Sequence, residues 1–437
     1  MTASGTALRS DRIAGATRWR LAFLAIQGGS SVVLFSALSH LLPARALAAT
    51  ALAQGVIVIA QAIGDFGLSQ AAVTVLPARI AEARGGATAL LSGAATAYLG
   101  ATCLAGLLTL AAVPFVPASA AAPVAVSALA AAAAVVVAGA DGILRSQGDF
   151  RRPVLLMAAS ELAGFAGLPA AALTGSAFWT CAAIAVGMAA GASGAVLALL
   201  QIQRRARPAS LRSFVSASVP LGVSQILIAA ATRADTLLAG SISGLIAAGT
   251  FEGCWRVYQL SQYLAGGVAS AAAPFIADRL GAGRPQDAAA LLGRLVLRIA
   301  SAGVVLAAGL YLLRSPIADL LTGSLGMHVS RSLPALVLVS PLGAIGFIGY
   351  YAVIGQDGQR RYVLVTFAAG AAVNLVLATV LGRAHGASGI VVACAAGQAV
   401  TNLLLIVRLG LFLRSLRQAP TPGATSCTPT GISRPVP

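Results

Sequence analysis

Four polar residues could do chemistry inside the otherwise apolar run 246–276. Glu252, Arg256, Gln259 and Tyr263 follow one another at spacings of four, three and four residues, which places them on one face of a helix. An arginine can hold a phosphate through a two-pronged hydrogen bond, and a glutamate four residues earlier can neutralise that arginine. The pattern leaves three roles open: a structural ion pair between Glu252 and Arg256, direct contact with a substrate anion, or a gating contact.

Other side chains near this face extend the candidate binding site. Trp255 and Tyr258 flank the face and, with Tyr263, could stack on sugar rings. Arg233, in the preceding apolar run, is a second candidate for holding an anion. Because Asp235 lies two residues further on, we expect Arg233 and Asp235 to close the outer mouth of a cleft.

Three acidic residues in apolar runs are candidates for coupling or gating: Asp65, Glu161 and Asp235. An ionised carboxylate costs free energy inside a membrane, so each such residue requires an explanation. For Asp65 the alternatives are a helix cap, a gate residue or a site for a coupling ion. For Glu161 they are a buried, hydrogen-bonded acid or a proton relay.

The elements that position these residues are apolar runs of membrane-spanning length. Of the 437 residues, 58% are hydrophobic and only 9% are charged, whereas a soluble domain normally has about 25% charged residues. A spanning helix needs about 20 apolar residues. We predict an all-α polytopic membrane protein with about twelve transmembrane helices, at 19–42, 48–76, 89–113, 121–144, 153–174, 178–203, 213–234, 246–276, 290–313, 330–355, 362–382 and 388–413.

The basic charges predict the orientation of these spans. The net charge of +17 rests on 29 arginines, and all but six of them fall at one set of alternating helix ends. Because cytoplasmic loops carry the excess of basic residues, we expect both termini in the cytoplasm. The arginines therefore indicate topology and contact with anionic membrane lipids, and we expect no nucleic-acid partner.

Two strings recur at equivalent places along the chain and indicate two halves. RSQGDFRRPVLL at 145–156 resembles IGQDGQRRYVLV at 354–365, and each joins a fourth span to a fifth. This pattern predicts two parallel-repeat six-helix bundles around a central cleft, an arrangement found in transporters. The predicted organisation is a cytoplasmic N-terminal segment (1–18), a first bundle (19–203), a cytoplasmic linker (204–212), a second bundle (213–413) and a disordered cytoplasmic tail (414–437).

The composition argues against an enzyme and against a metal or cofactor site. The five cysteines and three histidines form no cluster with metal-ligand spacing. The chain has only 12 acidic residues, and the longest outer loop, near 314–330, is short. No arrangement of nucleophile and base suited to catalysis is present in the sequence.

Several strings resemble the polysaccharide and O-antigen flippases, which belong with the MATE-type extruders to the multidrug/oligosaccharidyl-lipid/polysaccharide exporter superfamily. RADTLLAGSISGLIAAGTFEGCWRVYQL, beginning at Arg233, resembles the end of their seventh span and the start of the eighth. NLVLATVLGRAHGASGI at 374–390 resembles their eleventh span and the approach to the twelfth.

The resemblance implies a transporter that flips a lipid-linked oligosaccharide across the bacterial cytoplasmic membrane for surface polysaccharide synthesis. It also implies a polysaccharide polymerase or glycosyltransferases as partners. The alternative is a cation-coupled MATE-type multidrug exporter. That class favours acidic residues in the first or seventh span, and the first span, 19–42, has none.

Overall fold

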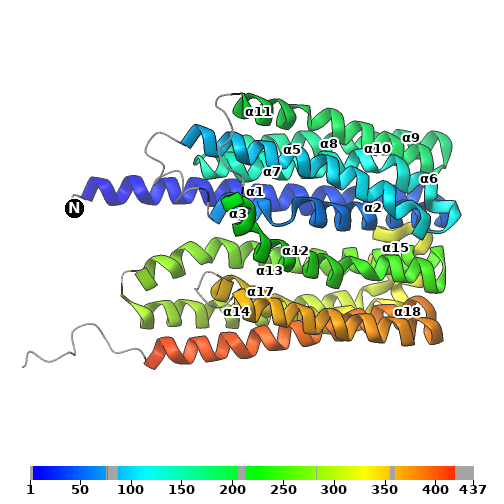
Figure 1. The fold of residues 1–437 in the computed structure, drawn as a ribbon. Helices are drawn as coiled ribbons and strands as arrows, with labels where there is room; N and C mark the ends of the chain where they lie inside the picture. The colour runs from blue at the N-terminus through cyan, green and yellow to red at the C-terminus, as the bar shows by residue number, and fades with distance from the viewer. Residues whose placement is uncertain are drawn as a thin grey trace, which may run out of the picture.

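A computed structural model describes residues 3–74, 76, 87–204, 212–281, 283–354 and 360–418, and all of its regular secondary structure is helical. Figure 1 shows the helices as two stacked layers, with the first half of the chain above the second. Each of the twelve predicted spans falls on a helix or on a pair of helices joined end to end. The prediction of an all-α membrane fold in two halves is therefore confirmed.

The first half contains the helices up to α11, several of which are broken in mid-span. Pro123 lies inside α6, and short 3-10 turns follow α5 and α8. The helices are α1 (Ala3–Leu41), α2 (Ala44–Asp65), α3 (Leu68–Thr74), α5 (Ala87–Ala112), α6 (Ala118–Val126), α7 (Ala128–Ser146), α8 (Arg151–Ala163), α9 (Gly167–Thr174), α10 (Ala177–Gly191) and α11 (Ser193–Gln203).

The second half begins with α12 and ends with the long α18, which is two helical rods joined at Gly386, where φ is +60°. A π-helical turn, Ala239–Ser243, follows α12. The helices are α12 (Arg212–Leu238), α13 (Leu245–Gly281), α14 (Pro285–Leu312), α15 (Arg314–Thr322), α16 (Gly326–Ser332), α17 (Pro334–Ile354) and α18 (Arg360–Gln418).

Among the described residues, seven helices are long and apolar enough to cross a membrane, and up to nine if each bent pair forms one span. This number is below twelve partly because α18 is counted once despite its break at Gly386. A second reason is that helices such as α13 carry polar residues, which lower their hydropathy.

The ends of the helices can be compared with the predicted organisation. Helix α1 begins at Ala3, so most of the predicted N-terminal segment is helical and continuous with the first span. Helix α18 runs to Gln418, five residues into the predicted tail, and residues 419–437 lie outside the described residues. Most of the predicted linker, 205–211, and residues 355–359 of the second repeated string also lie outside them.

The predicted outer loop near 314–330 is in fact helical and lies against the end of α1. Its helices, α15 and α16, are joined by a 3-10 turn. The Ser36 hydroxyl donates a hydrogen bond to the carbonyl oxygen of Leu320 at 2.9 Å, and Nε2 of His40 lies 2.9 Å from the same oxygen. These contacts join the two halves at the helix ends opposite the termini.

At the other end of α2 the halves meet backbone to backbone. Phe66 and Gly67 both have positive φ, at 40° and 71°, and they turn the chain from α2 into α3. A Cβ atom added at Gly67 would lie 2.7 Å from the carbonyl carbon of Leu221 on α12. Only glycine allows this approach together with this backbone conformation.

Gly67→Ala should therefore destabilise the protein by about 1–3 kcal/mol, because alanine is strained at positive φ and its methyl group meets the α12 backbone. Thermal unfolding of the purified protein in detergent measures the effect as a lower midpoint. Gly100→Ala is the control, since Gly100 has no atom within 4 Å of an added Cβ. Equal midpoints for the two variants would contradict this account of the contact.

Candidate functional site

Glu252 is the centre of a buried group of charges between α12 and α13. Its side chain is 0% exposed. Nη1 of Arg233 donates to both carboxylate oxygens, at 2.7 and 3.0 Å, and the Thr236 hydroxyl donates to Oε2 at 3.2 Å. Nε of Arg256 lies 2.9 Å from Oε1. We call Arg233, Glu252 and Arg256 the central cluster.

Arg256 connects the central cluster to the first half. Its guanidinium donates to the Ser31 hydroxyl on α1 and, at 2.7 Å, to Oε1 of Gln54 on α2. It also lies over the ring of Phe35, 5.6 Å from the ring centroid. The central cluster therefore lies at the interface between the halves, and the hydrogen bonds that Arg256 makes across this interface are to neutral groups.

The charges of the central cluster leave one positive charge in excess. A charge inside hydrocarbon costs about 2.5–3.5 kcal/mol, so a buried excess charge needs compensation or a ligand. Glu161 on α8 interacts electrostatically with Arg256 and accepts a hydrogen bond from the Ser30 hydroxyl at 3.0 Å. The central cluster and Glu161 together carry two positive and two negative charges and are formally neutral. Glu161 belongs to the first half.

Tyr263 lies near these charges, on the same helix as Glu252 and Arg256. Its ring packs on Gly28 of α1, where an added Cβ atom would lie 2.6 Å from two ring carbons. The glycine therefore lets α1 and α13 approach closely enough for Arg256 to reach Ser31.

Two of the aromatic side chains predicted to stack on sugar rings are buried in this conformation. Trp255 and Tyr258 are 5% and 3% exposed, and they belong to a hydrophobic cluster that contains residues of both halves. Their ring centroids lie 5.2 Å apart, and Arg233 lies over the Trp255 ring at 5.8 Å. Like the central cluster, these rings are enclosed by protein in this conformation, and their contact with a sugar stays a prediction. Gln259 is half-buried, and its Oε1 has no hydrogen-bond partner among the described residues.

Arg233 and Asp235, which were predicted to close the outer mouth of a cleft, make separate contacts in this conformation. Arg233 points toward Glu252, whereas Oδ2 of Asp235 accepts a hydrogen bond from Nδ2 of Asn374 on α18, at 2.7 Å. Residues two apart on a helix point to different sides, so these charges do not face each other. Asp235 is fully buried, and its Oδ1 is without a hydrogen-bond partner among the described residues.

Asp65 lies apart from the central cluster and has the contacts of a helix cap. Its carboxylate accepts hydrogen bonds from the backbone N–H and the hydroxyl of Ser69, at 3.2 and 2.8 Å, in the first turn of α3. Of the three roles left open by the sequence, this geometry matches capping. The arrangement holds α3 at the turn where Gly67 meets α12.

Sequence reasoning missed four residues that contact the cluster. Thr236 bonds to Glu252, and Phe35, Ser31 and Gln54 contact Arg256. Ser31 and Gln54 lie 225 and 202 residues from Arg256 in the chain, so no local spacing relates them to it. Thr236 is one turn beyond Arg233 on α12, and that i, i+3 spacing is a signal that could have identified it.

Comparison with known proteins places this geometry in a transporter fold. Residues 220–380 match the family model MatE. The chain is similar to the inward-facing conformation of a multidrug resistance MATE family transporter of the MOP superfamily, with a TM-score of 0.70 and 17% identity over 91% of this chain and 96% of that one. No curated protein matches the chain.

Two further solved structures have the same overall arrangement. The outward-facing conformation of a multidrug resistance MATE family transporter gives a TM-score of 0.61 at 17% identity, covering 93% of this chain and 96% of that one. The eukaryotic MATE transporter AtDTX14 gives 0.66 at 16% identity, covering 93% and 97%. The chain therefore has the fold of MATE transporters, and most of its second half matches the MatE family. Members of that family are transporters rather than enzymes, in agreement with the sequence analysis.

Gly28→Ala should separate α1 from α13, because the added methyl group overlaps the Tyr263 ring. Overpacking of this kind costs about 1–3 kcal/mol, and we expect a lower unfolding midpoint in detergent. Gly29→Ala is a matched control, since nothing lies within 4 Å of a Cβ atom at Gly29. If Gly28→Ala unfolds at the same temperature as Gly29→Ala, the packing of Tyr263 on α1 does not hold the interface together.

Proposed function

We propose that this protein flips a lipid-linked oligosaccharide, a polyprenyl-diphosphate sugar, across the bacterial cytoplasmic membrane by alternating access. The observation that carries the proposal is the central cluster, which lies between the halves of a transporter fold and holds two arginines against one glutamate. The resemblance of the sequence to polysaccharide flippases gives the same substrate class.

The physical obstacle to flipping such a lipid is its headgroup. Each polar group transferred into hydrocarbon without a hydrogen-bond partner costs about 2–7 kcal/mol, and an unpaired ion costs far more. A guanidinium can bind a diphosphate with two parallel hydrogen bonds and remains charged at any accessible pH. The polyprenyl tail can remain in the lipid while the headgroup passes between the halves.

The central cluster is closed in this conformation and becomes accessible when the halves part. The Arg256 and Arg233 side chains are 6% and 7% exposed. Parting α13 from α1 and α2 removes Ser31 and Gln54 from Arg256, and a substrate anion can take their place. Glu252 stays with both arginines, since all three charges belong to the second half.

The proposal includes a location and partners. The distribution of arginines favours an inner-membrane protein with both termini in the cytoplasm, where the lipid-linked substrate is assembled. Membrane lipids carry the substrate, and a polysaccharide polymerase or glycosyltransferases act before or after the flipping step. Accessibility of cysteines introduced at the two termini to an impermeant reagent measures the orientation.

Arg256→Gln should abolish flipping, because glutamine keeps hydrogen-bonding capacity and loses the charge that binds diphosphate. The assay is flipping of a fluorescent polyprenyl-diphosphate sugar in liposomes reconstituted with equal amounts of protein. Arg331→Gln, at an exposed position on α16, is the control and should retain activity. Flipping by Arg256→Gln at the rate of the control would remove Arg256 from the mechanism.

The alternative function is a cation-coupled multidrug exporter, and two observations favour it. Asp235 is a buried acid whose contacts are suited to binding a proton or a small cation, and two of the three structures named above are of multidrug resistance MATE family transporters. Its hydrogen-bond donor, Asn374, is neutral. This reading predicts export of organic cations rather than of anionic lipid headgroups.

Asp235→Asn decides between a coupling and a structural role for this acid. If the chain is a cation-coupled exporter, liposomes should take up a cationic dye under an imposed pH gradient, and Asp235→Asn should lose that uptake while remaining folded. If dye is not transported and the labelled lipid is, the exporter alternative fails. Circular dichroism of the purified variant is the control for folding.

A further inference from the structure

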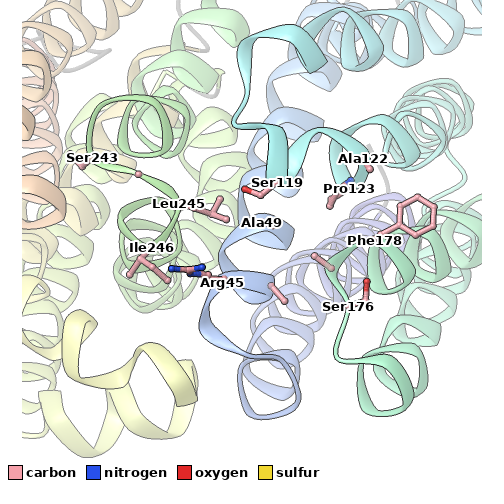
Figure 2. Close-up of a pocket in the computed structure, with 13 residues that line it drawn as sticks. Arg45, Ala49, Ser119, Ala122, Pro123, Ser176, Phe178, Ser243, Leu245 and Ile246 are labelled. Carbon is pink, nitrogen blue, oxygen red and sulfur yellow. The ribbon is translucent and has the colours of Figure 1, made fainter.

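A cavity of about 650 Å³ lies between the two halves, and Ile246 in its wall is six residues before Glu252 on α13. It is at the helix ends opposite both termini, where α6 and α9 end the upper layer in Figure 1. Figure 2 shows walls formed by the starts of α2, α6 and α10 and by the residues that lead into α13. Its volume is in the range of small-molecule sites.

The cavity carries a positive charge that no acidic residue offsets. Arg45, the second residue of α2, is exposed and extends into the space between α2 and Ile246 (Figure 2). None of the 13 lining residues drawn is an aspartate or glutamate, and within the described part of the chain no carboxylate forms an ion pair with Arg45. The guanidinium is therefore available to a ligand.

The walls add hydrogen-bond donors to this charge. Four helices of at least nine residues, α2, α6, α10 and α13, all begin at the cavity, and first-turn residues of each line it. The first turns of α2, α6 and α10 have no side-chain cap, and two of them follow a proline, Pro43 or Pro117. The N–H groups of a first turn lack partners within the helix and carry about half a positive charge. The hydroxyl of Ser119 also lines the cavity.

We propose that this cavity is a binding site for a phosphate or diphosphate group, with Arg45 as its charged contact. The first-turn N–H groups and the Ser119 hydroxyl complete the shell of donors, and Leu245, Ile246 and Pro123 form its apolar wall. The group is carried by a lipid headgroup or is free in solution. The site does not use the central cluster, so it stands apart from the proposed flipping activity.

The test is calorimetric titration of the full-length protein, in nanodiscs of uncharged lipid, with inorganic pyrophosphate and with farnesyl diphosphate. We expect saturable binding of at least one of them, weakened by about tenfold in Arg45→Gln, the usual loss for a charged hydrogen-bonding partner. Ala122→Trp, which fills the cavity and keeps the charge, should weaken binding as well. Arg331→Gln, at the same end of the molecule, should bind like the original protein.

The two ligands identify the source of the group. Binding of pyrophosphate assigns a free anion, and binding of farnesyl diphosphate alone assigns a lipid headgroup. Because Arg256 is itself a proposed diphosphate contact, the comparison is repeated in the Arg256→Gln background, where Arg45→Gln should still weaken binding by about tenfold. Absence of binding by both ligands, or an affinity in Arg45→Gln equal to that of the original protein, would overturn the proposal. That result leaves the flipping proposal standing, because flipping is tested through Arg256 and measured as transport.

Discussion

The interface between the two halves of this protein depends on the burial of one carboxylate, that of Glu252. Without it, the guanidinium groups of Arg233 and Arg256 would face each other in a medium of low dielectric constant, where like charges repel strongly. Removing one partner from such a buried group costs about 3–5 kcal/mol. Because Arg256 also holds Ser31 and Gln54 in the first half, the network that neutralises the arginines is the same one that joins the halves.

These hydrogen bonds form only because the helices approach one another closely. Small residues face each other along α2 and its neighbours: a Cβ atom added at Gly55 would lie 3.3 Å from Thr236 on α12, and one added at Gly249 would lie 2.8 Å from Ala48. In lipid, where no hydrophobic force drives helices together, close packing of small residues is a main source of association. The alanine and glycine content of the chain thus serves the polar network directly.

The sequence was sufficient to predict the helices and the pair of Glu252 and Arg256 within one helix. It was insufficient to predict the contacts between helices. Apolar runs must be helical in lipid because every backbone group needs an internal hydrogen bond. The spacing of Glu252 and Arg256 likewise determines that they share a face. The contacts between helices depended on packing between distant segments. Such packing determines which neutral residues meet Arg256 and what surrounds Trp255.

The distribution of charge across the interface bears on how the halves can separate. Arg233, Glu252 and Arg256 all belong to α12 and α13, so separation of the halves breaks no ion pair within the central cluster. The hydrogen bonds that Arg256 makes across the interface are to a hydroxyl and an amide, and such bonds contribute net stability of about 0.5–3 kcal/mol each, the upper part of this range applying to charged donors. A substrate anion that replaces both acceptors offers Arg256 a stronger partner than either. Separation also takes Glu161 of the first half away from Arg256, so that the excess positive charge of the central cluster is left without its offset. The closed interface therefore needs no ligand, whereas the open one favours an anion.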